Sequence, residues 1–289
     1  MKFLKYNSNL CDHWSRSIIL MVTKDCPNKC EFCIDQYNIG VKGKPDFEAI
    51  TNTLLKYYDK IDNLTISGGE PLLYLHETYN LVKFLKEYNP KVEIVINSSI
   101  PYNCYVNKEL FEDLVEISNG ILLSAQHYKQ DIADKIRNSK SKFDRNEFYR
   151  SLKNKDKYLI SLNVHKPYLY EKEDVLNNIM FFNNMGFKNI KICELFESPN
   201  SYVSIDDILG IKLPQPFAVG CSNKNYDASK ILPNFNGNLT LKKTCFIKSR
   251  NLNANFWDLF KTITRKPFMR KDYFFGVVQP NGEIYTHWI

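Results

Sequence analysis

Short apolar segments rich in β-branched residues alternate with amphipathic segments of helical period over the first two thirds of the chain. Each apolar segment is long enough for one buried strand, and each amphipathic segment is long enough for a helix. Repeated strand–helix–strand units of roughly 30 residues build a parallel sheet covered by helices. We therefore expect six strands, at Ser17–Thr23, Asn63–Ser67, Val92–Asn97, Ile121–Ala125, Tyr158–Val164 and Asn189–Glu194, and helices at Asp46–Tyr58, Leu75–Tyr88, Asn107–Ile117 and Lys172–Met185, with a broken helix across Gln130–Lys153.

The unusual residues of this region follow the expected strands. In a barrel of parallel strands, the carboxyl ends of all strands converge on the active site. The pattern therefore predicts a single functional rim on an α/β barrel. In chain order its members are the cysteine loop after the first strand, Gly68-Gly69-Glu70, Asn97-Ser98-Ser99, Ser124 to His127, Asn163 with His165, and Glu194 at the end of the sixth strand.

Three cysteines lie in the loop after the first expected strand, in the order Cys26-Pro27-Asn28-Lys29-Cys30-Glu31-Phe32-Cys33. Three thiolates on one short loop bind three irons of a [4Fe–4S] cube and leave the fourth iron open to a small molecule. A closed structural zinc site needs four ligands, and the next cysteine is the distant Cys104. The spacing favours an iron–sulfur cluster, and a zinc site completed by a distant Cys or His is the alternative.

The cysteine loop and the turn Gly68-Gly69-Glu70-Pro71 together resemble the radical S-adenosylmethionine (SAM) enzymes, over roughly residues 15 to 194. The pattern is closest to the molybdopterin-precursor synthases and the peptide-modifying members. Ser124-Ala125-Gln126 is similar to their Ser-Leu-Asp or Ser-Ile-Asp stretch, with Gln126 in place of the acid. The resemblance implies a partial (β/α)6 TIM-like barrel, which agrees with the six strands expected from the alternation.

The resemblance also implies the site residues. Cys26, Cys30 and Cys33 would hold the metal and be the catalytic residues, and Phe32 would shield the cluster from water. The turn after the second strand would bind the methionyl amino group of SAM, with a carboxylate as acceptor. The cofactor-binding candidates are Phe32, Gly68, Gly69, Glu70, Asn97 and Ser98 near the ribose, Ser124, Arg137 and Glu194. The alternative interpretation of Ser124 is a strand-end hydroxyl, and that of Arg137 is a solvated helix residue. Glu194 could instead form a salt bridge at the rim.

The resemblance implies a reaction as well. A low-potential donor of the flavodoxin or ferredoxin type would reduce the cluster, and bound SAM would be cleaved to a 5′-deoxyadenosyl radical that takes hydrogen from a substrate. Two substrate classes stay open: a peptide or protein, and a nucleotide, nucleic acid or other anionic metabolite. A nucleic acid is the less favoured partner. A non-enzymatic structural metal-binding module is the remaining alternative.

Beyond residue 194 the alternation stops, and prolines, asparagines and glycines mark a loop-rich extension. We expect residues 1–194 to form the barrel and residues 195–289 to form a cap or substrate-binding extension. Two segments, Pro233–Leu239 and Pro280–Tyr285, each predict a turn that feeds a strand. A basic and aromatic cluster at Lys242–Lys271 contains one acid, Asp258, and favours either an anion site or a solvated surface.

Cysteine usage and hydropathy point to the cytoplasm. The chain has 289 residues, of which 44% are hydrophobic, and its net charge is +7. It lacks both a membrane-length apolar run and an apolar stretch after Met1, so we expect no membrane partner and a cytoplasmic location. In that setting a tight cysteine cluster favours metal over disulfides. The scattered Cys193, Cys221 and Cys245 are too sparse to predict a second cluster, and Cys245 is a candidate hydrogen-atom donor.

Overall fold

The computed structural model describes residues 16–33, 43–195, 201–212, 221–244, 268–270 and 273–285. Its strands belong to one 11-stranded sheet, in the order β11-β10-β1-β2-β3-β4-β5-β6-β8-β7, with β9 paired to β10. Neighbouring strands from β1 to β6 are parallel. The six are β1 (Arg16–Met21), β2 (Asn63–Ser67), β3 (Glu93–Ser98), β4 (Gly120–Ser124), β5 (Tyr158–Val164) and β6 (Asn189–Glu194).

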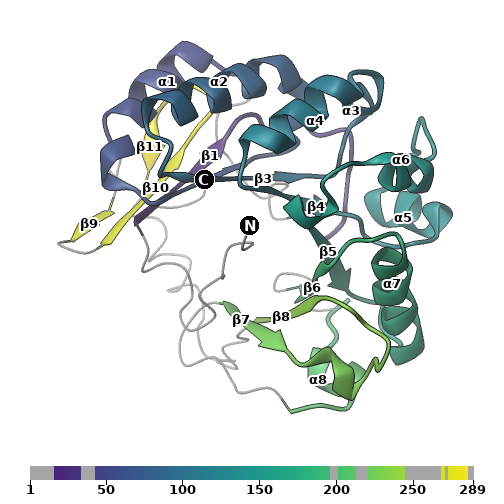
Figure 1. Cartoon of the computed structure of the whole chain (residues 1–289). Helices are drawn as coiled ribbons and strands as arrows, with labels where there is room; N and C mark the ends of the chain where they lie inside the picture. The colour runs from purple at the N-terminus through teal and green to yellow at the C-terminus, as the bar shows by residue number, and fades with distance from the viewer. Residues whose placement is uncertain are drawn as a thin grey trace.

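The sheet is curved and not closed, and its helices lie on the outer, convex side (Figure 1). This is the partial barrel that the family resemblance implied, built on the parallel sheet that the alternation predicted, and three of the six strand ranges agree residue for residue. The helices are α1 (Phe47–Leu55), α2 (Leu75–Tyr88), α3 (Tyr102–Val106), α4 (Lys108–Ile117), α5 (Gln130–Arg137), α6 (Arg145–Ser151), α7 (Lys172–Asn184) and α8 (Ile205–Leu209), with a 3-10 turn, η4 (Pro71–Tyr74), after β2.

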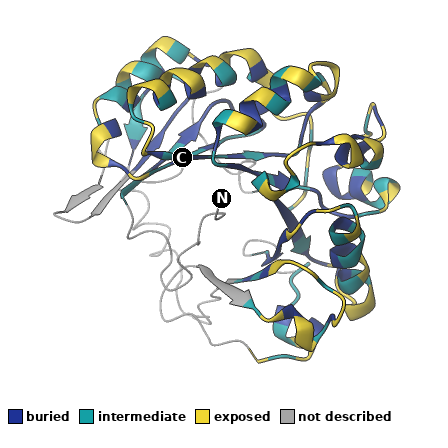
Figure 2. Ribbon diagram, in the orientation of Figure 1, coloured by how far each residue is buried: buried dark blue, intermediate teal, exposed yellow. Residues whose placement is uncertain are grey.

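Alternate side chains of each strand face the helices and form the main core. Leu64 and Ile66 on β2, and Ile190 and Ile192 on β6, are fully buried in one cluster with residues of the outer helices. Because successive side chains of a strand point to opposite faces, the residues between them face the inside of the barrel. Figure 2 shows the same division: the strands are largely buried, and the exposed residues lie on the outer sides of the helices.

The C-terminal part of the chain adds strands to both edges of this sheet. β8 (Asn238–Thr244) pairs in parallel with β6, and β10 (Tyr273–Val278) pairs in parallel with β1. β7 (Cys221–Tyr226) and β11 (Ile284–Tyr285) then pair with them in antiparallel fashion, as does β9 (Phe268–Arg270) with β10. The sheet therefore continues past residue 194, and the division into residues 1–194 and 195–289 stays a prediction.

Both C-terminal turn segments lead into strands, as their sequences predicted. The first precedes β8, and the turn at Pro280-Asn281-Gly282 joins β10 to β11. Gly282 has a φ of 78°, which glycine adopts without strain. Its carbonyl accepts a hydrogen bond from Thr53 Oγ1 on α1 at 2.6 Å, and the Pro280 carbonyl accepts one from Asp46 N at 2.8 Å. This hairpin is thus bound to the first helix of the barrel.

The ends of three helices differ in how they are capped. The Asp46 side chain accepts from Ala49 N at 2.9 Å and caps α1, and Gly186, with a φ of 95°, follows α7. Asn107, which precedes α4, makes no side-chain capping bond. Its amide instead donates to the Asn103 carbonyl at 3.0 Å, because α3 ends directly before it and presents that carbonyl.

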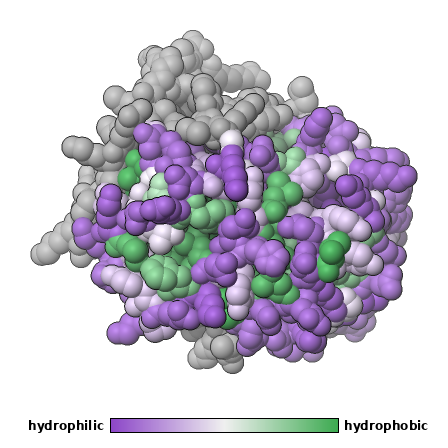
Figure 3. Space-filling view, turned by 90° about the horizontal axis from the view of Figure 1, so that it is seen from above, coloured by the Kyte–Doolittle hydropathy of each residue, from purple (hydrophilic) through white to green (hydrophobic). Residues whose placement is uncertain are grey.

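The outer surface is mainly hydrophilic in the view of Figure 3, with hydrophobic side chains in small patches. In the described part of the chain, no helix is long and apolar enough to cross a membrane.

Candidate active site

The cysteine loop leaves β1 at the carboxyl edge of the sheet. Cys26 is exposed, and Cys30 and Cys33 are half-buried. Desolvation raises the pKa of the Cys26 thiol to about 12 and that of Cys30 to about 11. A bound metal reverses this effect because a coordinating thiol is deprotonated outright. Binding of iron by this loop would therefore release protons.

The described side chains do not form a closed site for one metal ion: no three His, Cys, Asp or Glu groups among them converge in that way. A cube binds each thiolate to a different iron, so its three ligands stand farther apart than the ligands of a single ion. The donor set on this loop, three thiolates, is the soft set that an iron–sulfur cluster requires. The residues fit a [4Fe–4S] cluster.

The glycine turn after β2 is bound to the start of the cysteine loop. Gly69 N donates to the Thr23 carbonyl at 2.7 Å, and Glu70 N donates to the Asp25 carbonyl at 2.9 Å. A Cβ atom on Gly68 would lie 2.4 Å from the Thr23 oxygen, and one on Gly69 would lie 2.4 Å from the Asp25 oxygen. Both glycines are therefore required by the backbone of the cysteine loop itself, a reason that the sequence did not reveal.

The Glu70 carboxylate is buried, at 1% exposure, and accepts four hydrogen bonds. Oε1 accepts from Leu72 N at 3.2 Å and from Ser98 Oγ at 2.8 Å, and Oε2 accepts from Ser99 N at 2.8 Å and Ser99 Oγ at 2.6 Å. Burial raises the pKa of Glu70, and these bonds act in the opposite direction. A carboxylate has about four acceptor positions. Glu70 therefore joins the turns after β2 and β3, and its expected contact with SAM stays a prediction.

The end of β3 contains the two ribose candidates, which face different sides. Asn97 lies on the inner face of the sheet, where its amide donates to Ser67 Oγ at 3.5 Å. Ser98 is buried at 3% exposure, donates to Glu70 and accepts from Ile100 N at 2.8 Å. Of the two candidates, Asn97 is the better placed for a ligand inside the barrel.

Asn28 ties the cysteine loop to the turn after β3. Its amide donates to Ser99 Oγ at 2.8 Å, and Ser99 Oγ in turn donates to Glu70. The Asn28 backbone N–H points to the Cys26 sulfur, 3.4 Å away. The loop between the first two cysteines is therefore positioned by the same turn that holds Glu70.

Arg137 lies at the end of α5 and is almost fully buried, at 1% exposure. Its Nη2 donates to the carbonyls of Ser124 (3.1 Å) and Ala125 (2.7 Å) at the end of β4. Its own carbonyl accepts from Lys29 N at 2.7 Å, which places it against the cysteine loop. Burial lowers the pKa of Arg137 to about 10, which leaves the guanidinium charged at neutral pH.

Two nitrogens of Arg137, Nε and Nη1, are buried and find no acceptor among the described residues. An unsatisfied buried donor is costly, and a guanidinium N–H forms a strong hydrogen bond with a carboxylate. A free N–H of this kind is able to donate to the carboxylate of SAM, the role expected for Arg137. The solvated-helix alternative does not fit a side chain that is buried. Ser124 contributes its carbonyl to this arrangement, and the role expected for its hydroxyl stays a prediction.

Phe32 lies between the second and third cysteines and packs against His165 after β5. Their ring centroids are 5.1 Å apart, in an edge-to-face arrangement. His165 Nδ1 pairs with the Asn163 carbonyl at 2.9 Å, and burial lowers the pKa of His165. Because a carbonyl only accepts, Nδ1 carries a proton in this contact. His165 thus fixes the aromatic side chain that was expected to shield the cluster.

Glu194 ends β6 on the face that packs against the helices. Its Oε1 accepts from Ile205 N, the first residue of α8, at 2.9 Å, and the residue is 3% exposed. Desolvation raises the pKa of the nearby Tyr202 to about 12, and the charge of Glu194 acts in the same direction. These contacts give Glu194 a structural part in holding α8, and its expected role as a cofactor ligand stays a prediction.

Polar residues on the second half of the rim form few bonds with one another. Gln126 follows β4 with a φ of 71° and is buried at 4% exposure. Its Oε1 accepts from Asn163 Nδ2 on β5 at 3.4 Å, and Ser161 Oγ lies 3.7 Å from the Cys193 sulfur across β5 and β6. Cys245, the candidate hydrogen-atom donor, lies outside the described residues.

The chain matches one family model and is similar to solved structures of other proteins. The family model of the radical SAM superfamily matches residues 20–193. No protein of curated function matches the chain. The structure is similar to Streptococcus suis SuiB bound to the precursor peptide SuiA, with 14% identity, a TM-score of 0.58 and coverage of 94% of this chain and 59% of SuiB. It is also similar to SuiB bound to SAM, with 16% identity, a TM-score of 0.57 and coverage of 94% and 60%.

At these identities the likeness to SuiB shows the fold, and this chain spans about three fifths of the length of SuiB. The open parallel barrel and the three-thiolate loop define an enzyme that works with a cofactor at the carboxyl ends of its strands. The chain belongs to the radical SAM superfamily. It is a radical SAM enzyme, and its cofactors are a [4Fe–4S] cluster and SAM. The non-enzymatic metal-binding alternative is therefore set aside.

Proposed function

We propose that this enzyme uses SAM to take a hydrogen atom from a peptide or protein substrate bound inside the barrel. The cluster and SAM supply the radical chemistry when bound, with electrons from a low-potential donor of the flavodoxin or ferredoxin type. The likeness to SuiB extends over 94% of this chain, past the family match into the C-terminal strands. SuiB binds a precursor peptide, which supports a peptide substrate here.

The residues of the chain contribute binding, orientation and exclusion of water. The three cysteines of the loop would hold the cluster, with Phe32 covering one side. The turn at Gly68 to Glu70 and the guanidinium of Arg137 would hold SAM. The turn and Arg137 are both fixed by hydrogen bonds to backbone groups before any ligand binds, which lowers the cost of placing the reacting atoms.

The observation that carries the peptide proposal is a set of neutral polar side chains at the ends of β4 and β5. Gln126 and Asn163 present primary amides, which have both donors and acceptors, as a peptide group does. Burial lowers the pKa of His127 to about 4 and also lowers the pKa of His165. Neutral donors and acceptors suit a peptide backbone better than a phosphate or carboxylate, which needs positive charge nearby.

A second candidate is an anionic substrate, favoured by lysine on the inner face of the barrel. Lys191 on β6 is 7% exposed and alternates with the core residues Ile190 and Ile192. Lys242 on β8 pairs with Cys193, so it lies on the same inner face. Most of the basic cluster at Lys242–Lys271 lies outside the described residues. Loss of substrate binding as salt is raised would favour this candidate, since salt screens charge-based binding.

The first test is anaerobic reconstitution of the protein, followed by iron and sulfide analysis. Dithionite and SAM are then added, and 5′-deoxyadenosine is measured by mass spectrometry. We expect one [4Fe–4S] cluster per chain and slow SAM cleavage, both lost in Cys30→Ala. Cys104→Ala is the matched control, because Cys104 is buried in the core and belongs to α3 rather than to the loop. Zinc instead of iron, or a cluster that never cleaves SAM, would contradict the proposal.

The substrate class is tested with the same reconstituted enzyme. A random peptide library and a pool of nucleotides and acidic metabolites are supplied separately, and 5′-deoxyadenosine formation is compared with the rate without substrate. A rise with the peptides alone, unchanged by moderate salt, supports the peptide proposal. A rise confined to the anionic pool supports the second candidate.

A further inference from the structure

Arg145, the first residue of α6, belongs to none of the sequence motifs, yet it is buried at 7% exposure beside the site. Its Nη1 donates to two successive carbonyls of the turn after β3, Ser99 at 2.6 Å and Ile100 at 3.0 Å. Its guanidinium also lies over the Phe143 ring, 5.1 Å from the centroid. A buried charge in so specific a set of contacts fixes the backbone that it touches.

The backbone held by Arg145 is strained. Ile100 has a φ of 55°, in the left-handed region that a β-branched residue rarely adopts. Such a conformation persists when the surroundings impose it. Arg145 holds the carbonyl of Ile100, and Ser98 Oγ accepts from its N–H at 2.8 Å. The turn is therefore clamped from both sides.

The same turn carries the groups that hold Glu70. Ser99 donates from N and Oγ to the Glu70 carboxylate, while its carbonyl accepts from Arg145. Ser99 thus links the buried carboxylate of Glu70 to the buried guanidinium of Arg145. Movement of the Ser99 backbone would change both contacts, and with them the glycine turn of which Glu70 is part.

Arg145 is also bound to the helix that carries Arg137. Its Nε donates to Ser141 Oγ at 2.7 Å, and Ser141 N donates to the Asp134 carboxylate at 2.9 Å. Asp134 and Arg137 lie on α5, one turn apart. A single guanidinium therefore connects the two segments expected to hold the amino group and the carboxylate of the methionyl part of SAM.

We propose that Arg145 is a positioning residue for SAM: it fixes the Ser99–Ile100 turn, and through it Glu70, relative to Arg137. The proposal rests on the SAM site described above and assigns Arg145 no contact with SAM. It predicts that loss of the guanidinium weakens SAM binding while the cysteine loop still holds its cluster. Lysine at this position keeps the charge but lacks the planar fork that binds several acceptors at once.

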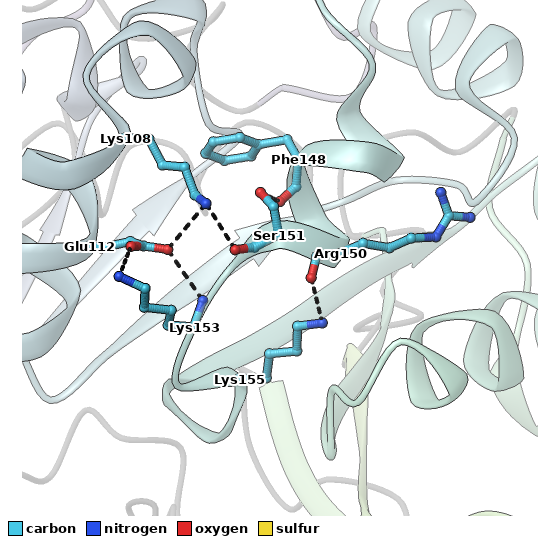
Figure 4. Close-up of polar contacts among 7 residues, drawn as sticks. All are labelled: Lys108, Glu112, Phe148, Arg150, Ser151, Lys153 and Lys155. Atoms are coloured by element: carbon cyan, nitrogen blue, oxygen red, sulfur yellow. Dashed lines mark hydrogen bonds and ion pairs between the residues drawn. The ribbon is translucent and has the colours of Figure 1, made fainter.

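The test compares Arg145→Ala and Arg145→Lys with Arg150→Ala as the matched control. Arg150 is exposed on the same helix, and its carbonyl, rather than its guanidinium, accepts from Lys155 at 3.0 Å. Figure 4 shows the Arg150 guanidinium pointing away from the other polar groups drawn. Each reconstituted protein is measured for iron and sulfide, for the SAM dissociation constant by calorimetry, and for the change that SAM causes in the electron paramagnetic resonance spectrum of the reduced cluster.

We expect wild type and Arg150→Ala to behave alike. Arg145→Ala should keep its iron and sulfide, bind SAM roughly 10- to 100-fold more weakly, and recover part of the affinity in millimolar guanidinium. The SAM affinity of Arg145→Lys should lie between those of the wild type and Arg145→Ala. This lysine variant provides the test if the alanine variant does not fold. Unchanged SAM affinity in both variants overturns the proposal, and so does loss of the cluster in step with SAM affinity. A wild-type cluster that does not bind SAM instead overturns the SAM site itself.

Discussion

The two halves of the barrel rim differ in how completely their polar groups are already bonded. At the ends of β1 to β3, the glycine turn, Glu70 and Ser99 form a continuous set of bonds to one another and to the cysteine loop. At the ends of β4 to β6, Gln126 and Asn163 share one bond of 3.4 Å. Saturated groups hold one geometry, whereas groups with spare donors and acceptors are able to bind a ligand.

This difference matches two tasks. The first half must present the same cofactor site in every turnover, so its rigidity is useful before any substrate arrives. The second half must accept a substrate and release a product, which favours weak internal bonds. The comparison predicts that changes in the first half cost stability and cofactor binding together, and that changes at Gln126 and Asn163 in the second half leave cofactor binding intact.

The largest effect is expected for Gly69→Ala. Its new Cβ would lie 2.4 Å from the Asp25 carbonyl oxygen, a backbone atom that cannot move without shifting the cysteine loop. We expect a loss of about 3 kcal/mol in the free energy of unfolding. Iron content after reconstitution should also fall sharply. Both are measured on the purified protein, by denaturant unfolding and by iron analysis.

Gly210→Ala provides the control for this change. Gly210 has a positive φ, of 64°, but no atom lies within 4 Å of the position that a Cβ would take there. The substitution should cost about 1 kcal/mol for backbone strain and leave the iron content unchanged. Equal iron loss in both variants would break the comparison, because the clash at Gly69 would then not be the cause.

Glu70→Gln comes next. The amide keeps one acceptor oxygen and places an NH2 group against donors from Ser98, Ser99 or Leu72. We expect a loss of about 2 kcal/mol in stability and weaker SAM binding. Burial raises the pKa of Glu70 in the folded protein above its ordinary value. The wild type should therefore lose stability as pH rises from the ordinary carboxyl pKa through the pKa of the folded state. The variant has no carboxyl group at this position and should lack this dependence of stability on pH. Thermal unfolding at several pH values, with the exposed Glu87→Gln as control, measures both effects.

His127→Gln changes a residue of the second half of the rim, and it should alter the stability of the protein only at acidic pH. The pKa of His127 is lowered to about 4, chiefly by burial, and its Nδ1 accepts from Lys129 N at 3.0 Å. The unfolded chain therefore takes up a proton before the folded chain does as pH falls from the ordinary histidine pKa to the folded one, and the wild type loses stability over that range. The variant should lose less over this range, while exposed His76→Gln should follow the wild type. Identical acid slopes in all three proteins would contradict the assignment.

The sequence predicted the barrel well because its signal is periodic and local. The ranges Asn63–Ser67, Tyr158–Val164 and Asn189–Glu194 are the same in the structure as in the prediction. The partners of β8 and β10 were not predicted, since their pairing with β6 and β1 depends on contacts far apart in the chain. β8 also alternates Leu239 and Leu241 with polar residues, a pattern typical of any half-buried strand.

The sequence indicated which residues belong to the candidate site better than it indicated what each of them does there. The cysteines and the glycine turn were candidates because their chemistry and spacing are unusual, and Arg137 was a candidate because of the family resemblance. That Gly68 and Gly69 are packed against the cysteine loop, and that Glu194 holds α8, depends on backbone approach that sequence does not encode locally. Arg145 was missed for the same reason: an arginine at the start of a helix is usually a surface residue, and its burial follows from tertiary packing.

The smallest effect is expected for Gln126→Gly, and its sign is the informative part. Gln126 has a φ of 71°, which costs a non-glycine residue about 1 kcal/mol and costs glycine almost nothing. The glycine variant should therefore match or exceed the wild type in stability, whereas Gln126→Ala, which loses the same amide but keeps the strain, should be less stable. Both should retain the cluster and the slow cleavage of SAM without substrate.

The same pair of variants also tests the distinction between the two halves of the rim. If the Gln126 amide binds the substrate, both variants should lose the rise in 5′-deoxyadenosine that peptides cause, although only one of them keeps the backbone strain. Loss of that rise in the glycine variant alone would instead assign the effect to the backbone conformation. A glycine variant that loses its cluster would show that the second half of the rim supports the cofactor as well, and the distinction between the two halves would fail.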